Sequence, residues 1–342
     1  MSNQSLNQAA WILKAKEQLQ VKEAPFPKAD AGQVVIKSRA IAINPVDWKI
    51  QAYDDLPGLK YPSILGCDLA GEVHEVGSGV TNVQKGDRVI GMAVQLVTGN
   101  SAQGAFQKYV LLPSNVVAKI PSSMSFTEAA VLPLNISTAL HLLFRKETLG
   151  LPLPSTPGTA PPKTNKSVLV WGGSSSVGAC AIQLAAAAGV KVVTVASAHN
   201  LENVKGLGAS AAFDYKSPSV IDDIVSALAG TDFTGIADTI GGDAPKTWGP
   251  VYKKLGGRFG TVTPPQDMPE GIEGEMVYAE LIAAAKEAHE TIWGGWLEQA
   301  MEKGTAKALP PAKVVGKGLE SLQDAMEVQK NGVSFQKIVV EV

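Results

Sequence analysis

The segment Lys166-Ser-Val-Leu-Val-Trp-Gly-Gly-Ser-Ser-Ser-Val-Gly178 decides the fold of this chain. An apolar run ends in two glycines and passes directly into Ser175–Gly189, where apolar and small residues recur at a spacing of three and four. The pattern predicts a buried strand, a tight turn and a helix that packs closely on a sheet. We expect Gly173 to permit the turn, Gly178 to permit close approach of helix and strand, and Gly189 to cap the helix.

The start of such a helix is an anion site, because its first N–H groups have no partner within the helix. In the dinucleotide fingerprint G-x-G-x-x-G the anion is a pyrophosphate, although here Ser175 replaces the middle glycine. A Gly-Gly-Ser turn can also be a sharp bend and nothing more, and for the motif alone that alternative stays open. The residues expected to bind the cofactor at this turn are Gly173, Ser174, Ser175, Ser176 and Val177.

The sequence after the motif predicts a parallel, doubly wound sheet. Strands are expected at Lys191–Ala196, near Ala212-Phe213 and at Gly235–Thr239, with helices between them, one at Ile221–Leu228. A Gly-Gly turn before Arg258–Thr263 predicts the final strand of this sheet.

Nineteen residues past the last glycine of the fingerprint, where an acid would bind the ribose 2′-hydroxyl of NAD, the chain has Ser197. Ser197, His199 and Asn200 offer a hydroxyl, an imidazole and an amide instead, and Lys205 and Tyr215-Lys216 add donors for a doubly charged group. We therefore expect NADPH as the cofactor. The alternative is that Ser197 and Asn200 only cap the next helix.

Composition sets the outer limits. A chain of 342 residues, 45% hydrophobic and 18% charged, suits two globular domains. The net charge of −2 gives no reason to expect nucleic acid or a membrane surface as a partner. We expect no apolar run long enough to span a bilayer and no signal peptide, hence a cytoplasmic protein. The two cysteines, Cys67 and Cys180, cannot form a disulfide framework, and Cys180 is expected to be a small buried residue.

The first third of the chain carries short strands separated by Gly, Pro and Asn, which predicts a mainly antiparallel barrel. These strands are expected at Gln33–Ile43, Gly71–Val76, Asp87–Gly91 and Ala105–Leu112.

Three further segments complete the expected organisation. Trp293–Glu302 is expected to be helical, Phe335–Val342 a strand that returns to the first domain, and Leu149–Thr164, with five prolines, an exposed irregular loop. The expected domains are 1–135, 136–285 and a C-terminal return over 286–342.

Seven segments in order resemble the medium-chain dehydrogenase/reductase superfamily over nearly the whole chain. They are Asn44–Lys49, Pro62–Val73, Val83–Val89, Gly104–Tyr109, Ala130–Pro133, the glycine run and Leu207–Tyr215. The glycine run, Ser197–Asn200 and Phe213–Lys216 most resemble the zinc-independent branch that includes quinone reductases and fungal trans-acting enoyl reductases. The resemblance implies an α/β protein with a GroES-like, mainly β catalytic domain, a Rossmann domain and a cleft between them.

Zinc alcohol dehydrogenases share this architecture, but their ligands are replaced here. Asn44–Asp47 stands where that branch has its first cysteine ligand, Gly66-Cys67-Asp68 stands where it has Gly-His-Glu, and the four-cysteine lobe is missing from the sequence. Cys67, Asp68 and His74 are the one plausible cluster, and a glycine-rich strand turn explains them better. We expect no metal.

The resemblance implies hydride transfer to the β-carbon of an α,β-unsaturated carbonyl, with donors for the developing enolate oxygen. It places Asn44 and Thr138 along the nicotinamide and ribose, with Thr138 also a candidate catalytic residue, and Lys49 and Tyr53 near the substrate as donors or proton source. Alternatively, Lys49 is a solvated charge and Tyr53 only packs between domains. The expected function is an NADPH-dependent enoyl or enone reductase; quinone reduction and a non-catalytic NADPH-binding partner protein are the alternatives.

The remaining cofactor groove is assigned by resemblance too. Val262 and Thr263 are expected against the nicotinamide amide, and Ser334, Gln336 and Lys337 of the terminal strand are expected to reach the cofactor. The substrate is expected to be an enone, a quinone or an acyl thioester, with a polyketide synthase as a candidate partner. Monomer and homodimer both remain open.

Overall fold

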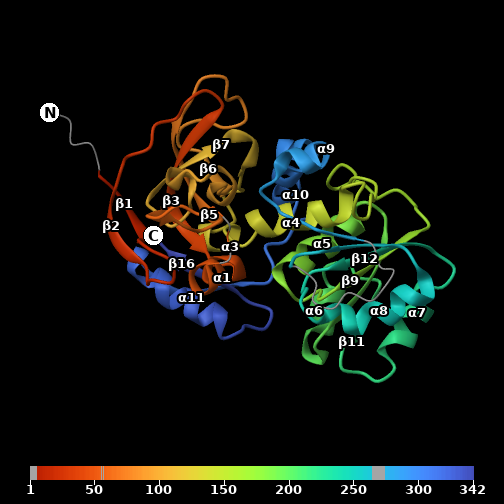
Figure 1. Ribbon diagram of the computed structural model, residues 1–342. Helices are drawn as coiled ribbons and strands as arrows, with labels where there is room; N and C mark the ends of the chain where they lie inside the picture. The colour runs from red at the N-terminus through yellow and green to blue at the C-terminus, as the bar shows by residue number, and fades with distance from the viewer. Residues whose placement is uncertain (1–5, 55, 57, 264–273) are drawn as a thin grey trace. The chain divides into compact units, whose positions relative to one another are not determined.

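The computed structural model describes residues 6–54, 56, 58–263 and 274–342 (Figure 1). The chain forms two compact units. The first comprises Met1–Leu134, Trp293–Glu302 and Pro311–Val342, and the second comprises Asn135–Ile292 and Lys303–Pro310. The chain thus leaves the first unit twice, for Asn135–Ile292 and for the short segment Lys303–Pro310, and returns each time.

The first unit is built on a sheet of seven strands in which β3 is the most extensively paired. β3 pairs antiparallel with β5, β7 and β16, so the C-terminal strand does return to the first unit as predicted. A smaller sheet has the order β2-β1-β4. The strands are β1 (Asn7–Ile12), β2 (Gln20–Ala24), β3 (Gln33–Ala42), β4 (Ser63–Ile64), β5 (Asp68–Val76), β6 (Arg88–Met92), β7 (Tyr109–Pro113), β8 (Val117–Lys119), β15 (Ala312–Lys317) and β16 (Lys337–Glu341).

Alternating apolar residues of these strands bury one core cluster, which includes Val34, Ile36, Leu69 and Val110. The helices of this unit are α1 (Pro45–Tyr53), α2 (Gln95–Thr98), α3 (Phe126–Ala129), α10 (Leu297–Glu302) and α11 (Leu322–Lys330). A π-helical turn, Ile292–Trp296, leads into α10, so the predicted helix at Trp293–Glu302 is present but irregular at its start.

Side chains fasten α1 to the C-terminal helix α11. Gln51 Nε2 donates to Gln323 Oε1 at 2.9 Å, Gln323 Nε2 donates back to Gln51 Oε1 at 3.1 Å, and Trp48 Nε1 donates to Gln329 Oε1. The position of α1 therefore depends on a segment nearly three hundred residues later in the chain.

The second unit contains the predicted parallel sheet, with the strand order β11-β10-β9-β12-β13-β14. The strands are β9 (Lys166–Trp171), β10 (Lys191–Ala196), β11 (Ala211–Asp214), β12 (Asp232–Asp238), β13 (Arg258–Thr261) and β14 (Gly274–Met276). The expectation that Arg258–Thr263 is the final strand is wrong, because β14 pairs parallel on its outer side. The short segment Gly274–Met276 carries too few residues for its period to be recognised in the sequence.

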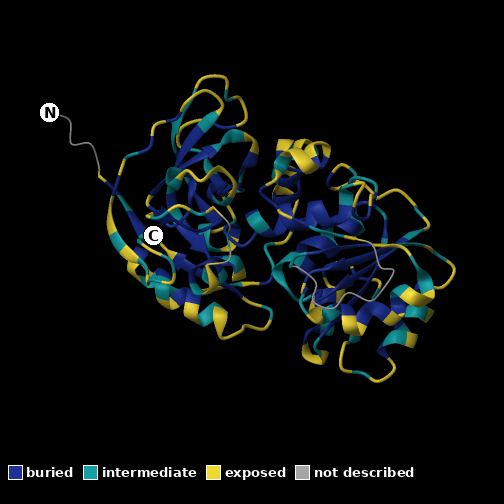
Figure 2. Cartoon of the chain, in the orientation of Figure 1, coloured by how far each residue is buried: buried dark blue, intermediate teal, exposed yellow. Residues whose placement is uncertain are grey.

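Helices flank this sheet and bury their apolar stripes against it. In α7, Val220, Ile224 and Leu228 are buried at the spacing of one helical face, and Figure 2 shows the buried strands with the exposed outer faces of α7 and α8. The helices are α4 (Pro133–Phe144), α5 (Ser176–Ala187), α6 (Leu201–Lys205), α7 (Val220–Leu228), α8 (Ala244–Leu255) and α9 (Lys286–Thr291).

Two expectations from the sequence need correction. Leu149–Thr164 is irregular but not wholly exposed, because Leu149 and Leu151 are only 2% and 4% exposed. Burial of two leucines stabilises a loop that proline composition alone places in solvent.

The expectation of no bilayer-length apolar run is also wrong: Phe126–Phe144, nineteen residues, meets the criteria of length and composition. Of its apolar window, 78% is buried inside the protein, as in the core helix of a globular protein.

Candidate functional site

The turn after β9 has the geometry that the glycines predict, with one reassignment. Gly172, not Gly173, adopts the left-handed backbone, with φ +89°. Gly173 is needed for space instead, because a Cβ there would lie 2.2 Å from Thr194 Oγ1. At Gly178 a Cβ would lie 2.2 Å from the carbonyl oxygen of Gly172, so helix and strand do approach closely there, as predicted.

Ser175, at the position of the missing middle glycine, is the N-cap of α5. Its Oγ accepts from the Gly178 amide at 2.9 Å and shares a hydrogen bond of 2.8 Å with Thr239 Oγ1. Thr239 Oγ1 also donates to the carbonyl of Trp171 at 2.8 Å. The Ser175 hydroxyl therefore fixes the turn from within.

Two amides at this turn, those of Ser176 and Val177, have no acceptor within the helix. The Gly178 amide is taken by Ser175, and the Ala179 amide bonds the Ser175 carbonyl. The amides of Ser176 and Val177 are the first two of the helix, where no intrahelical acceptor exists, and both residues are half-buried. With the positive end of the helix dipole, they have the geometry that favours an anion, and their contact with a pyrophosphate stays a prediction.

A buried aspartate that the sequence analysis missed shapes the neighbouring loop. Asp238, at the end of β12, is 0% exposed, and its Oδ1 accepts from the amides of Ile240 at 3.0 Å and Gly241 at 2.9 Å. Trp248 Nε1 donates to its other oxygen at 3.2 Å. Burial raises the pKa of Asp238, and these hydrogen bonds oppose that rise. An aspartate next to the last residue of the predicted strand Gly235–Thr239, shortly before Gly241-Gly242, was the signal in the sequence.

Val262 and Thr263 lie at the same edge of the sheet. The Val262 amide donates to the Asp238 carbonyl at 3.2 Å, and Thr263 Oγ1 accepts from the Gly242 amide at 3.1 Å. Both residues are half-buried. The ends of β9, β12 and β13 thus meet around the glycine turn, as parallel strands require.

The structure brings together some of the residues that were predicted to bind the 2′-phosphate. Ser197 follows β10 and Tyr215 follows β11, and the Tyr215 amide donates to the Ala196 carbonyl at 3.3 Å. His199 is exposed, and neither Ser197 nor Asn200 caps the following helix with its side chain. Both residues do occupy N-cap positions, Ser197 of the short helix Ala198–Asn200 and Asn200 of α6, so the capping alternative fails only in its side-chain hydrogen bond.

Other members of that group are engaged elsewhere or remain at the surface. Asn200 is 4% exposed, and its Oδ1 accepts from Asn203 at 3.3 Å. Lys205 is paired with Glu202 at 2.9 Å. Lys216 is exposed beside Tyr215, so the accessible donors at this edge are Ser197, His199, Tyr215 and Lys216.

In the first unit, Asn44 and Lys337 meet in a buried polar cluster. The Lys337 ammonium lies 3.0 Å from Asp68 Oδ2 and donates to Asn44 Oδ1 at 2.5 Å. Asn44 Nδ2 donates to Asp68 Oδ2 at 2.8 Å, and the Leu134 amide donates to Asp68 Oδ1 at 2.6 Å. These contacts account for the polar atoms of Asn44 and Asp68 without a cofactor.

Asp47 adds a second buried carboxyl group at this end of the sheet and was also missed. It is 1% exposed, and its Oδ2 accepts from the Asn44 amide at 2.7 Å. Burial raises the pKa of Asp47 to about 7; the nearby Asp68 acts in the same direction, while the Asn44 hydrogen bond and Lys337 oppose it.

The residues that could have bound zinc do not fit that ion. Both oxygens of Asp68 are engaged, one of them by an ammonium, which repels a second cation. His74 packs by its ring edge against Phe26 and Tyr109, with centroids 5.5 and 5.1 Å away. Within the described ranges no three His, Cys, Asp or Glu side chains are arranged to hold a metal.

The predicted catalytic residues lie in different elements. Lys49 and Tyr53 are both on α1; Lys49 is half-buried with its ammonium 5.9 Å from the Trp48 ring, and Tyr53 is 60% exposed. Thr138 lies on α4 in the second unit and is 8% exposed. Ser334 and Gln336 are exposed just before β16.

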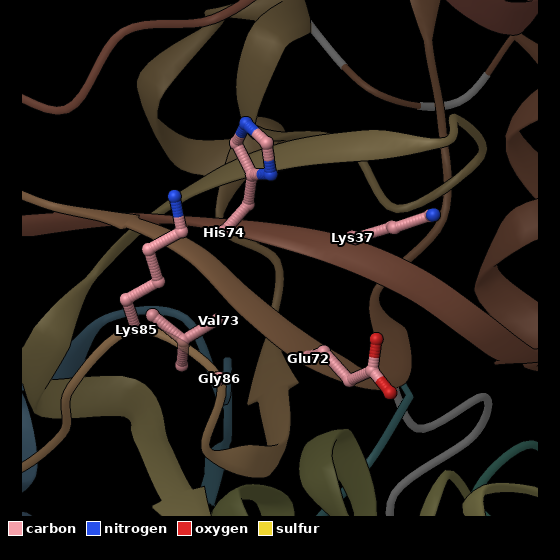
Figure 3. A pocket seen from close by; sticks show the side chains of 6 residues that line it. All are labelled: Lys37, Glu72, Val73, His74, Lys85 and Gly86. Carbon is pink, nitrogen blue, oxygen red and sulfur yellow. The ribbon is translucent and has the colours of Figure 1, made fainter.

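A shallow hollow of about 270 Å³ in the first unit holds none of these residues (Figure 3). Of its charged side chains, Glu72 is engaged in an ion pair with Arg39 at 2.8 Å. It is lined by Lys37, Glu72, Val73, His74, Lys85 and Gly86.

Two families match this chain in succession. Residues 30–122 match the family described as the alcohol dehydrogenase GroES-like domain, and residues 176–278 match the family described as zinc-binding dehydrogenase. The first match falls within the first unit, and the second covers most of the parallel sheet of the second unit.

Individual proteins match over nearly the full length. The dehydrogenase orf1 of Aspergillus niger is 41% identical over 346 residues, and the trans-enoyl reductase himH of Aspergillus japonicus is 39% identical over 347 residues; each match covers 98% of both chains. An alcohol dehydrogenase superfamily protein of Novosphingobium aromaticivorans has the same fold, with a TM-score of 0.76 and 24% identity over 98% of this chain and 99% of its own. The chain therefore belongs to the medium-chain dehydrogenase/reductase superfamily of oxidoreductases, among its fungal dehydrogenases and trans-enoyl reductases.

Proposed function

We propose that this protein is an NADPH-dependent reductase that adds hydride to the C=C bond of an α,β-unsaturated carbonyl compound without a metal ion. The observation that carries the proposal is the 39% identity with the trans-enoyl reductase himH over 98% of both chains. The matched region spans 98% of the chain, so it includes the nucleotide turn and α1, which carry residues that we assign to the reaction.

The edge of the parallel sheet supports a nicotinamide dinucleotide with a 2′-phosphate. The amides of Ser176 and Val177 would hold the pyrophosphate, and Ser197, His199 and Lys216 would donate to the 2′-phosphate. No acid follows β10 to repel that phosphate, since Ser197 and Ala198 stand there. When bound, NADPH would supply the hydride.

The engaged state of Asp68 supports a reaction without a metal. A zinc ion would have to displace the buried Lys337 ammonium and the Asn44 amide from the carboxylate. Reduction of an electron-poor alkene needs hydrogen-bond donors at the carbonyl oxygen instead. We assign Lys49 and Tyr53 as those donors or the proton source, and Thr138 to orient the cofactor. The cofactor contacts of Asn44, Ser334 and Lys337 stay predictions.

An NADPH-oxidation assay with enones, acyl thioesters and quinones tests the proposal. We expect oxidation with enones and acyl thioesters, an NADPH affinity at least tenfold above that for NADH, and no loss of rate after metal removal with a chelator. Faster reduction of quinones favours the quinone reductase, the second candidate. Cofactor binding without oxidation of any of these compounds favours an NADPH-binding partner protein.

The similarity to a trans-enoyl reductase also supports a partner. We propose that the acyl thioester is presented by a polyketide synthase in the cytoplasm, with this chain acting as a monomer or homodimer. Co-purification with such a synthase, and the mass of the free protein in light scattering, check these points.

A further inference from the structure

Ser175 stands where the dinucleotide fingerprint has its middle glycine, the residue that lets the backbone approach a pyrophosphate. It is half-buried and precedes α5 as its N-cap, with φ −72° and ψ 161°. Any residue adopts this backbone conformation, so glycine is not needed there for its φ and ψ. A side chain at this position must leave room for the anion, so the place of the Ser175 hydroxyl decides whether a serine is acceptable.

The hydroxyl hydrogens of Ser175 and Thr239 have a definite order. Each hydroxyl has one hydrogen to donate, and a carbonyl oxygen has none. Thr239 Oγ1 lies 2.8 Å from the carbonyl oxygen of Trp171 and 3.0 Å from that of Gly172, so its hydrogen is used there. In the contact of 2.8 Å between the two hydroxyls, Ser175 is therefore the donor. Because Ser175 Oγ also accepts from the Gly178 amide at 2.9 Å, its hydrogen is engaged inside the protein.

Thr239 is itself held firmly in place. It follows β12 directly, is 5% exposed, and its amide donates to the Trp171 carbonyl at 3.1 Å. The residue before it, Asp238, is 0% exposed and accepts hydrogen bonds from two amides of the following loop. The loop after β12 thus presents the Thr239 hydroxyl at a fixed place beside the nucleotide turn.

A second hydroxyl pair joins the same two strands at their other end. β9 and β12 pair in parallel, and Ser167 near the start of β9 lies with its hydroxyl 2.7 Å from that of Thr231, just before β12. Thr231 Oγ1 also donates to the Leu228 carbonyl. This pair has the same chemistry as Ser175 and Thr239 but lies far along the strands from the glycine turn, so it provides a matched control.

We propose that Thr239 is a positioning residue for the cofactor. By accepting the Ser175 hydrogen it holds that hydroxyl against the end of β12, and this makes serine acceptable where the fingerprint has glycine. The pyrophosphate is then bound by the amides of Ser176 and Val177 and not by the Ser175 hydroxyl. The inference rests on the proposed NADPH-dependent function and adds to it a residue that orders the cofactor site without touching the cofactor.

Thr239→Val removes the hydroxyl and keeps the shape of the side chain. It leaves the Ser175 hydroxyl without its acceptor and the turn carbonyls without their donor, so NADPH affinity in a fluorescence titration should fall about tenfold. Thr239→Ser keeps the hydroxyl and should recover most of the affinity. Thr231→Val removes the matched hydroxyl and should lower the thermal unfolding temperature about as much as Thr239→Val does, without weakening NADPH binding.

A double-mutant cycle separates this role from a general loss of stability. Ser175→Gly restores the glycine of the fingerprint, and glycine is nearly as good an N-cap as serine, so we expect a smaller loss of NADPH affinity, about threefold. With no Ser175 hydroxyl to orient, adding Thr239→Val should then cost at most about a further threefold. A tenfold loss from Thr239→Val in both backgrounds, or unchanged or tighter NADPH binding in Thr239→Val alone, overturns the inference.

Amide hydrogen exchange of the free protein tests the pair without a cofactor. Thr239→Val should speed exchange of the Gly178 amide, which is bonded to Ser175 Oγ, and Thr231→Val should not. If the wild type binds no NADPH, or binds it and reduces no enone, acyl thioester or quinone, the proposed function fails, but faster exchange in Thr239→Val alone still supports Thr239 as the residue that orders the turn. Equal exchange of this amide in Thr239→Val and the wild type overturns that role.

Discussion

The Lys337 ammonium lies 3.0 Å from the Asp68 carboxylate, and their side chains are only 4% and 0% exposed. The pair joins the terminal strand β16 to the start of β5, with Asn44 bonded to both partners. Two buried charges stabilise a fold only as a pair, because either charge alone remains desolvated without compensation.

Lys337→Met should therefore lower the free energy of unfolding by about 3–5 kcal/mol, the usual cost of leaving one buried charge unpaired. Urea unfolding measures the loss. Adding Asp68→Asn to Lys337→Met removes the unpaired buried carboxylate and should recover part of the lost free energy of unfolding. Lys166→Met breaks an exposed pair with Asp232, 3.1 Å apart, and should cost at most about 1 kcal/mol. Equal losses of unfolding free energy in Lys337→Met and Lys166→Met would contradict a stabilising role of the buried pair.

Gly178→Ala should weaken NADPH binding at least about tenfold, because the new Cβ would push the Gly172 carbonyl, 2.2 Å away, out of the turn. Fluorescence titration with NADPH measures the affinity. Gly294→Ala is the matched control, since no atom lies within 4 Å of its Cβ position. Unchanged affinity in Gly178→Ala would show that the cofactor does not depend on this turn.

The buried histidine pair predicts acid sensitivity. His141 Nε2 and His289 Nε2 lie 3.2 Å apart, with the residues 0% and 2% exposed. Burial, with smaller effects of the other imidazole and of Arg145, lowers the pKa of His141 to about 3, and burial lowers that of His289 to about 4. The unfolded chain, with an ordinary pKa of 6.5, binds more protons, so stability should fall as the pH drops from about 6.5 toward 4.

The variant His141→Leu/His289→Leu should show a flatter pH dependence of the unfolding free energy over this range. His199→Gln, which removes an exposed imidazole, should keep the wild-type slope. Thermal unfolding between pH 4 and pH 7 gives both slopes, and a double variant as acid-sensitive as the wild type would refute the prediction.

Asp47 predicts a pH dependence of stability opposite in sign to that of the histidine pair. Its pKa is raised from 3.8 to about 7, so the folded protein holds a proton that the unfolded chain has released. The resulting stabilisation is complete below pH 3.8 and is lost as the pH rises through 7. A difference of three pKa units corresponds to about 4 kcal/mol of unfolding free energy. Relative to the wild type, Asp47→Asn should become more stable as the pH rises from 4 to 8, whereas the exposed Asp232→Asn should show no such trend.

The sequence by itself determined the nucleotide turn, because its chemistry is local. A strand, a helix and the glycines between them are adjacent in the chain, so spacing alone predicted Gly178, Gly189 and the parallel sheet. The same local pattern assigned the turn to Gly173, whereas the left-handed residue is Gly172. The two adjacent glycines are alike in the sequence and differ in their surroundings, with Ile240 beside Gly172 and Thr194 beside Gly173.

Only the tertiary structure decided the polar clusters. Asp68 and Lys337, His141 and His289, and Gln95 and Ser63 are separated by long stretches of chain and meet because strand pairing and helix packing bring them together. Burial then sets their charge and hydrogen bonding, since a group removed from water must find a partner or change its pKa. Residue types and spacing predict where an element forms, and only the packed fold determines which polar atoms are left facing one another.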